Sequence, residues 1–271
     1  MLPRLFPRLA GLGFALIIAW GMSSLARSQT QGDLSKYIMG EKKSGYVYAS
    51  AQTRAIEDDE FQNPGSLWLD KGKSLWNMAD GTAGKSCSSC HNAAAMSMKG
   101  VGASYPKFDA AVGRVIDIEE RINLERQRMG AEPWKWESEA LLAMTVYVKN
   151  QSRNMPITVA VDGPAHATWE KGKAFYEARR GQLDMSCVQC HGQNNNSKLR
   201  SETLSQGQIN GFPTYRLDWQ TVGSAQRRFR GCNEQVRAEP FAYGSPEYVA
   251  LELYLASRGN GLPVETPAVR K

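Results

Sequence analysis

Two five-residue segments of the sequence combine cysteine and histidine in the same way. They read "CSSCH" and "CVQCH". This C-x-x-C-H pattern attaches a c-type haem, because the two thiols bond to its vinyl groups and the histidine binds the iron. A redox-active C-x-x-C pair and a structural zinc site are the alternatives, but such zinc sites need further regularly spaced ligands. The pattern predicts two covalently bound haem c groups, held by Cys87, Cys90 and His91 and by Cys187, Cys190 and His191.

The two motifs lie in stretches that resemble each other. "DKGKSLWNMADGTAGKSCSSCH", from Asp70, matches "EKGKAFYEARRGQLDMSCVQCH", from Glu170, at an offset of 100 residues. Later the offset is 107, because "YVKNQSRNMP" from Tyr147 matches "YLASRGNGLP" from Tyr254. Apolar residues recur at three- and four-residue spacing in segments such as "SEALLAMTVYV", which indicates helices. The sequence predicts a mainly α fold of two tandem cytochrome c-like haem domains related by an internal repeat.

The fifth cysteine, Cys232, stands among arginines in "RRFRGCNEQVRAEPF". At the offset of 107 this stretch lies over "ERINLERQRMGAEPW", which pairs Arg228 with Arg121 and Cys232 with Glu125. A buried structural cysteine, a disulfide to a partner chain and a reactive thiolate beside the second haem are three interpretations. Neighbouring arginines lower a thiol pKa, and the thiolate is both the nucleophile and the metal-binding form. We therefore favour the thiolate.

The first 28 residues, "MLPRLFPRLAGLGFALIIAWGMSSLARS", have the pattern of a secretory signal peptide, with a retained membrane anchor as the alternative. Three of the 33 basic residues fall in this segment, which leaves 30 against 27 acidic residues, or +3. This charge gives no basis for nucleic-acid binding. The predicted organisation is a signal peptide (1–28), a first haem domain (29–160) and a second haem domain (161–271), with no membrane span in the mature chain.

The sequence resembles the SoxA family, the dihaem subunits of the SoxAX cytochromes of bacterial sulfur oxidation. The residues that carry the resemblance are "CVQCH", "LSQGQINGFPTYRL" from Leu204, "RFRGC" from Arg228 and "VALELYLASRGNGLPVE" from Val249. The resemblance implies a periplasmic L-cysteine S-thiosulfotransferase that forms a heterodimer with a monohaem SoxX-like cytochrome. Such an enzyme couples thiosulfate to a cysteine of the SoxYZ carrier and passes two electrons through haem to a downstream acceptor.

By the same resemblance, Cys232 is the active-site cysteine and an iron ligand, and Arg228 is the active-site arginine. A guanidinium group matches the oxygens of a sulfur oxyanion. If residues 228–232 are helical, the four-residue step puts both side chains on one face.

One position departs from the family pattern, because "INLER" places Glu125 where two-haem members commonly have cysteine. The first haem is therefore expected to have lost a thiolate ligand. Met129, one helical turn later, is the favoured replacement. The alternatives that stay open are Met96, Met98 or Met155, ligation by Glu125 itself, and an open or water-bound iron.

Three other functions share parts of this pattern. A thiosulfate dehydrogenase, which joins two thiosulfates into tetrathionate, would use the same cysteine and arginine. A plain dihaem electron-transfer cytochrome would have no role for Cys232, and a dihaem peroxidase resembles the chain only in its haem motifs. The C-terminal "ETPAVRK" is expected to be a flexible tail.

Overall fold

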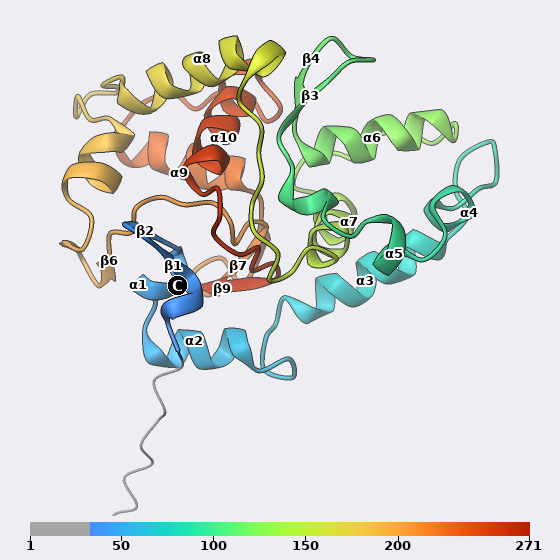
Figure 1. Ribbon diagram of the computed structural model, residues 1–271, viewed down its shortest axis with the longest axis horizontal. Helices are drawn as coiled ribbons and strands as arrows, with labels where there is room; N and C mark the ends of the chain where they lie inside the picture. The colour runs from blue at the N-terminus through green and yellow to red at the C-terminus, as the bar shows by residue number, and fades with distance from the viewer. Residues whose placement is uncertain (1–32) are drawn as a thin grey trace, which may run out of the picture. The chain divides into compact units, whose positions relative to one another are not determined.

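The computed structural model describes residues 33–271, which form one compact unit. The predicted signal peptide (1–28) lies outside the described residues. The expectation of a mainly helical fold is confirmed (Figure 1). None of the helices in the described part of the chain is long and apolar enough to span a membrane. The α-helices are α1 (Gly45–Tyr48), α2 (Ala51–Asp58), α3 (Ser66–Asn77), α4 (Cys87–His91), α5 (Ala94–Ser97), α6 (Ile118–Arg128), α7 (Glu139–Asn150), α8 (His166–Glu177), α9 (Ala225–Gln235) and α10 (Pro246–Arg258).

The strands are short and form small sheets at the edges of the helical layers. Four pairs are antiparallel hairpins. Three of them stand as two-stranded sheets, and β9 joins the fourth, β7–β8, by pairing with β7 in parallel, which makes a three-stranded sheet in the order β8-β7-β9. Short 3₁₀ helices cover Ser35–Tyr37, Val101–Ala103 and Gly163–Ala165, and a π-helical turn covers Gln189–Gln193. The strands are β1 (Ile38–Met39), β2 (Lys42–Lys43), β3 (Lys107–Asp109), β4 (Arg114–Ile116), β5 (Lys198–Leu199), β6 (Glu202–Thr203), β7 (Thr214–Arg216), β8 (Thr221–Gly223) and β9 (Ala268–Arg270).

Two helix pairs, α3 with α7 and α8 with α10, depend on one glycine each. A Cβ atom on Gly72 would lie 2.2 Å from the carbonyl oxygen of Ala143, and one on Gly172 would lie 2.0 Å from that of Ala250. No side chain fits at such distances, so the two backbones can approach closely only at glycine. Both glycines belong to the lysine-glycine-lysine triplets that the sequence comparison aligned at an offset of 100.

The later elements of the two halves follow the offset of 107. The hairpin β3–β4 corresponds to β7–β8, helix α6 to α9, and helix α7 to the first twelve residues of α10. Their N-caps correspond as well: Asp117 and Ser224 cap α6 and α9, and Ser138 and Ser245 cap α7 and α10. The seven additional residues of the second half lie between His191 and β7, in the segment that contains the hairpin β5–β6.

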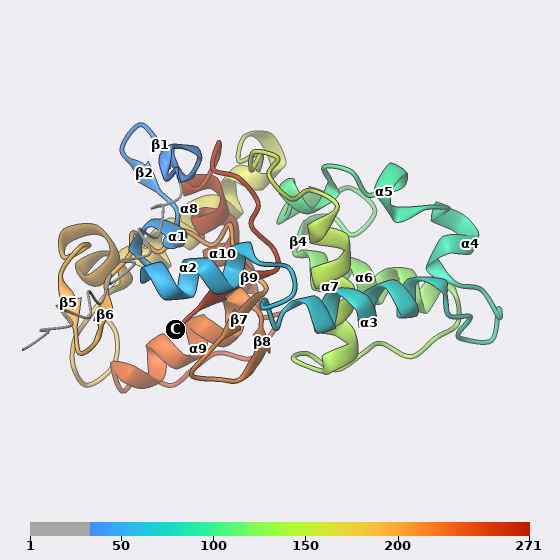
Figure 2. The same ribbon diagram turned by 90° about the horizontal axis from the view of Figure 1, so that it is seen from below.

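The N-terminal elements lie beside the second haem motif rather than the first (Figure 2). The backbone N–H of Lys43 donates to the side chain of Gln206 (2.8 Å), and the amide of Asn63 donates to the carbonyl of Pro267 (2.9 Å). The predicted boundary at residue 160 falls between α7 and α8, and it stays a prediction.

The expectation of a flexible C-terminal tail is wrong. Strand β9 is buried, and Arg270 forms ion pairs with Glu57 and Glu265, whose carboxylates are almost inaccessible to water. Val269 is fully buried, and its N–H donates to Glu57 (2.9 Å). Residues separated by more than two hundred positions thus hold the C-terminal strand in place.

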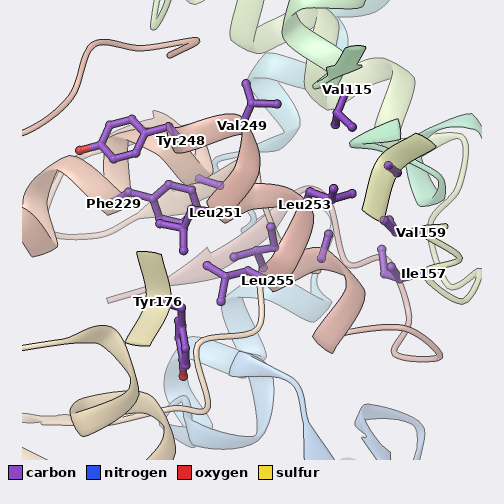
Figure 3. Packing of buried hydrophobic residues seen from close by; sticks show 14 of the residues in the cluster. Val115, Ile157, Val159, Tyr176, Phe229, Tyr248, Val249, Leu251, Leu253 and Leu255 are labelled. Atoms are coloured by element: carbon purple, nitrogen blue, oxygen red, sulfur yellow. The ribbon is translucent and has the colours of Figure 1, made fainter. Parts of the chain in front are cut away.

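The largest apolar cluster is centred on α10 (Figure 3). Leu253 points toward Val115 of β4 and Val159, whereas Leu251 and Leu255 point toward the aromatic residues of α8 and α9. All three leucines are buried. Because helix α10 presents apolar side chains to both halves of the chain, it holds the second haem motif and the first half together.

The glycine contact of α8 with α10 gives a stability prediction. Gly172→Ala should lower the free energy of unfolding of the holoprotein by about 1–3 kcal/mol. The added methyl group overlaps the backbone carbonyl of Ala250, which cannot rotate away. The melting temperature, followed by circular dichroism, should fall by about 2–4 °C per kcal/mol.

Gly231→Ala is the matched control. Gly231 lies in helix α9, and a Cβ atom there would meet nothing within 4 Å. This exchange should leave the melting temperature unchanged or raise it slightly, because alanine favours the helix by up to about 1 kcal/mol. Equal effects of the two substitutions would contradict the close helix contact.

Candidate active site

After helix α8 the chain forms a β-bridge between Arg180 and Met185 and then enters the second C-x-x-C-H motif. The end of this motif lies in the π-helical turn Gln189–Gln193. The side chain of Gln189 accepts a hydrogen bond from the N–H of Ser186 (2.8 Å), which fixes the start of the motif. The Nδ1 atom of His191 lies 2.8 Å from the carbonyl oxygen of Ser205. A carbonyl oxygen only accepts, so Nδ1 carries the proton and Nε2 keeps a free lone pair for a metal.

A cavity of about 530 Å³ opens in front of this motif. Its walls come from the segment from Gly45 to Thr53, the motif itself, the segment 198–216 with the hairpin β5–β6, the helices α8, α9 and α10, and the C-terminal strand. Apolar side chains make up much of the lining, namely Phe175, Ile209, Phe212, Phe229, Leu251 and Leu255. The predicted site residues of the second half all line this one cavity: Cys187, Cys190, His191, Arg228 and Cys232.

Helix α9 brings Arg228 and Cys232 to the cavity. The prediction that residues 228–232 are helical is confirmed, because α9 runs from Ala225 to Gln235. Both side chains are partly buried and line the cavity from one face of the helix, one turn apart. The phenyl ring of Phe229, which also lines the cavity, packs against Tyr248 of α10 and fixes the rotation of helix α9.

The charges around Cys232 favour its thiolate. Burial by itself would raise the pKa of this thiol, but nearby positive charge, first that of Arg228 and to a smaller extent that of Arg216, outweighs burial. The pKa of Cys232 is lowered to about 7. Burial and the charge of Cys232 raise the pKa of Cys187 to about 12. Burial also raises the pKa of Cys190. Among the three cysteines of the cavity, Cys232 is therefore the one that most readily forms a thiolate.

Five buried polar atoms of the cavity residues have no hydrogen-bond partner. They are the hydroxyl oxygens of Tyr48 and Tyr176, the side-chain oxygen of Gln208, and the Nε atoms of Arg180 and Arg216. Buried polar groups are normally satisfied, so such atoms indicate a group that belongs between them. Two thiols, an imidazole with a free Nε2, apolar walls and unsatisfied cationic donors together fit a covalently attached haem with its two carboxylate-bearing side chains.

The first C-x-x-C-H motif forms the short helix α4, which a capping box of Ser86 and Ser89 begins. Cys90 is exposed, and the ring of His91 lies 5.9 Å from that of Trp76. Cys87 packs at the edge of an apolar cluster that also contains Met98. This motif is thus more open to solvent than the second.

The residues predicted as candidate distal iron ligands of the first haem lie at different positions in the structure. The Glu125 carboxylate accepts hydrogen bonds from Arg121 (3.0 Å) and Arg128 (2.8 Å). Met129 is the C-cap of α6, one turn beyond Glu125, and it corresponds to Val236 of α9. The predicted ligand Met129 therefore lies at the end of the helix and not at the position equivalent to Cys232, and its ligation stays a prediction. Met96 is 83% exposed.

The sequence analysis missed two parts of the site. Arg216 lies at the end of β7 and lines the cavity, and the segment from Gly45 to Thr53 forms a wall although it precedes both motifs. The offset of 107 could have drawn attention to Arg216, because it pairs this arginine with Asp109 and so marks a reversal of charge. No pattern in the sequence indicated that the N-terminal segment contacts the second motif.

The helical fold, the two C-x-x-C-H motifs and the cavity in front of the second motif define a c-type cytochrome. A family model described as the SoxA/TsdA cytochrome c domain matches residues 71–157 and 171–264. The chain is 44% identical over 262 residues to the L-cysteine S-thiosulfotransferase subunit SoxA of Rhodovulum sulfidophilum, covering 96% of this chain and 91% of that protein. It is 48% identical over 233 residues to the same subunit of Pseudaminobacter salicylatoxidans, covering 85% and 82%.

A solved structure agrees with this result. The crystal structure of SoxXA from P. pantotrophus matches with a TM-score of 0.82 and 45% identity, over 85% of this chain and 87% of that one. The chain belongs to the SoxA family, as the sequence motifs indicated, and its cytochrome c domain implies haem c.

The charge environment of Cys232 gives a pH prediction. The thiolate fraction should rise as pH increases through about 7, so the rate of alkylation by iodoacetamide should rise over the same range. Arg228→Gln removes the strongest favourable charge, so the pKa of Cys232 should rise and the profile should shift to higher pH. The holoprotein is first treated with a phosphine, which returns any oxidised Cys232 to the free thiol. Mass spectrometry then follows the alkylation of this cysteine.

The control is Arg179→Gln. Arg179 is exposed and pairs with Asp184 (2.9 Å), so its removal takes the same charge from the surface. The control should keep the profile of the unsubstituted protein. An Arg228→Gln profile that does not move would mean that this guanidinium does not stabilise the thiolate.

Proposed function

We propose that this chain is the catalytic subunit of an L-cysteine S-thiosulfotransferase that joins thiosulfate to a cysteine thiol of a carrier protein. The observation that carries the proposal is the thiolate-forming Cys232, placed with Arg228 and His191 in one cavity. The curated names of the relatives support the same activity.

The reaction divides into two steps at the Cys232 sulfur. In the first step, the thiolate of Cys232 forms a bond to the terminal sulfur of thiosulfate, and two electrons leave. Two bound haem groups, each taking one electron, would supply the acceptors. Arg228 binds the sulfonate oxygens with its forked donors and holds the terminal sulfur next to Cys232. Burial of the site keeps water from competing for these oxygens.

In the second step, the carrier's cysteine thiolate attacks the sulfur that links Cys232 to the sulfonate. A new sulfur–sulfur bond forms to the carrier, and the bond to Cys232 breaks and returns its thiolate. The net change is one carrier thiolate plus one thiosulfate giving a cysteine S-thiosulfonate and two electrons. The low pKa of Cys232 suits this step, because a weakly basic thiolate is a good leaving group.

We also propose that the chain holds two haem c groups in two tandem domains, with residues 29–160 around the first motif and 161–271 around the second. The equivalent helices, caps and hairpins at the offset of 107 support this division. His91 and His191 are the proposed proximal ligands, Cys232 is the proposed distal ligand of the second haem, and Met129 is the candidate for the first.

The proposed partners follow from the family. A SoxX-like monohaem cytochrome would complete a heterodimer, which the likeness to a structure described as SoxXA supports. A SoxYZ-type carrier would bring the thiol, and a downstream acceptor would take the electrons. The predicted signal peptide and the covalent haem motifs support a periplasmic location.

Thiosulfate dehydrogenase is the second candidate, because the matching family model covers both SoxA and TsdA. The same cavity would then join two thiosulfates without a carrier. Tetrathionate formation in the presence and absence of SoxYZ separates the two activities. An electron-transfer cytochrome without a substrate site does not explain why arginine, histidine and Cys232 meet in a cavity.

Cys232→Ser tests the catalytic role. The variant should lose coupling of thiosulfate to the carrier by several orders of magnitude while it keeps its haem content, because a hydroxyl group cannot form the sulfur–sulfur bond. Coupling is measured by the mass of the carrier, and haem by the pyridine haemochrome spectrum. Full activity in the haem-replete variant would refute the mechanism.

The number of haems has a direct test. The intact mass of the holoprotein should exceed that of the mature chain by two haem groups. The double variant Cys87→Ala, Cys90→Ala should lose one haem and keep the second, because the two motifs bind independently. An unchanged mass increment in this variant would show that the first motif binds no haem.

A further inference from the structure

The two halves place opposite charges around equivalent arginines. At the offset of 107, Arg121 corresponds to Arg228, and the last residue of β3, Asp109, corresponds to the last residue of β7, Arg216. In the first half, Arg121 forms ion pairs with Asp109 and with Glu125 (3.0 Å). Its guanidinium group is therefore neutralised by carboxylates of the chain itself.

In the second half the equivalent arginine has no such partner. Among residues 33–271, no carboxylate forms an ion pair with Arg228, and an arginine replaces the equivalent aspartate. Arg216 is only 8% exposed. Burial lowers the pKa of its guanidinium group, and the nearby positive charge of Arg228 lowers this pKa further. Two guanidinium groups thus face one cavity with Cys232.

The donors of Arg216 are incompletely used. Its only ion pair in the described part of the chain is with Glu202 at 3.4 Å, from the hairpin β5–β6, and its buried Nε has no partner. A buried guanidinium group with a free donor is costly unless an anion completes it. Strand β7 is the centre of the three-stranded sheet, so the position of Arg216 is rigid.

The charge of the substrate calls for a second cation in this cavity. Thiosulfate carries two negative charges and enters beside the Cys232 thiolate, so the cavity holds three negative charges until two electrons leave. Arg228 and Arg216 can bind oxygens of the same sulfonate group and offset two of these charges. The first half cannot do this, because Asp109 and Glu125 already occupy its arginine.

We propose that Arg216 is a second oxyanion-binding residue of the cavity and, together with Arg228, holds the sulfonate of thiosulfate beside Cys232. This inference rests on the proposed function. The carboxylate side chain of a haem is an anion of the same chemistry, and the experiment distinguishes the two.

The test uses the holoprotein with its carrier and compares Arg216→Gln, Arg216→Lys and the surface control Arg179→Gln. Arg216→Gln should raise KM for thiosulfate about tenfold or more with a much smaller change in kcat, because a charge-assisted contact to bound substrate is lost. Arg216→Lys should restore part of the loss, since it keeps the charge but not the fork. Haem content should match that of the unsubstituted protein.

The opposite results overturn the inference. An unchanged KM in Arg216→Gln would show that Arg216 does not bind substrate. A shifted haem potential or lower haem content with an unchanged KM would assign Arg216 to the haem carboxylate instead. If Arg216→Gln fails to incorporate haem, Arg216→Lys decides alone: KM several times higher at full haem content supports the proposal, and an unchanged KM refutes it.

The proposed function can fail separately. A fully active Cys232→Ser variant would refute the function whatever Arg216 does. An inactive Cys232→Ser variant beside an Arg216→Gln variant of normal KM would leave the function intact and refute only the role of Arg216.

Discussion

Keeping a negatively charged sulfur inside a cavity is the constraint on which this site depends. A buried thiolate is unfavourable unless cations and hydrogen-bond donors surround it. The chain meets this requirement from two directions: Arg228 stands one helical turn before Cys232, and Arg216 comes from the sheet. Neither of these elements would place its side chain correctly without the packing of α8, α9 and α10.

The two halves show how similar backbones can support different chemistry. The helices, caps and hairpins that position Glu125 and Cys232 are equivalent residue by residue. What differs is the group that neutralises the equivalent arginine. Arg121 pairs with two carboxylates of the chain, whereas Arg228 has the Cys232 thiolate as its nearby negative charge. A few side chains, rather than a new fold, therefore separate a site that binds its own carboxylates from one that can accept an external anion.

Local patterns predicted much of this structure, and long-range contacts account for what they missed. Helix α9 and the shared face of Arg228 and Cys232 followed from spacing within one segment. The C-terminal strand did not, because its stability comes from pairing with β7 and from Arg270 between Glu57 and Glu265. A short polar segment looks like a tail until its partners, which lie far away in the sequence, are known.

The ion pair between Glu57 and Arg270 has a consequence for how the cavity is built. The two residues are 213 positions apart, and Arg270 lines the cavity together with the segment from Gly45 to Thr53. A wall that depends on such a contact exists only where the two segments meet in the folded chain, and bringing their ends together costs conformational entropy. The cavity around the second haem motif is thus a property of the whole folded chain and not of the motif's own segment.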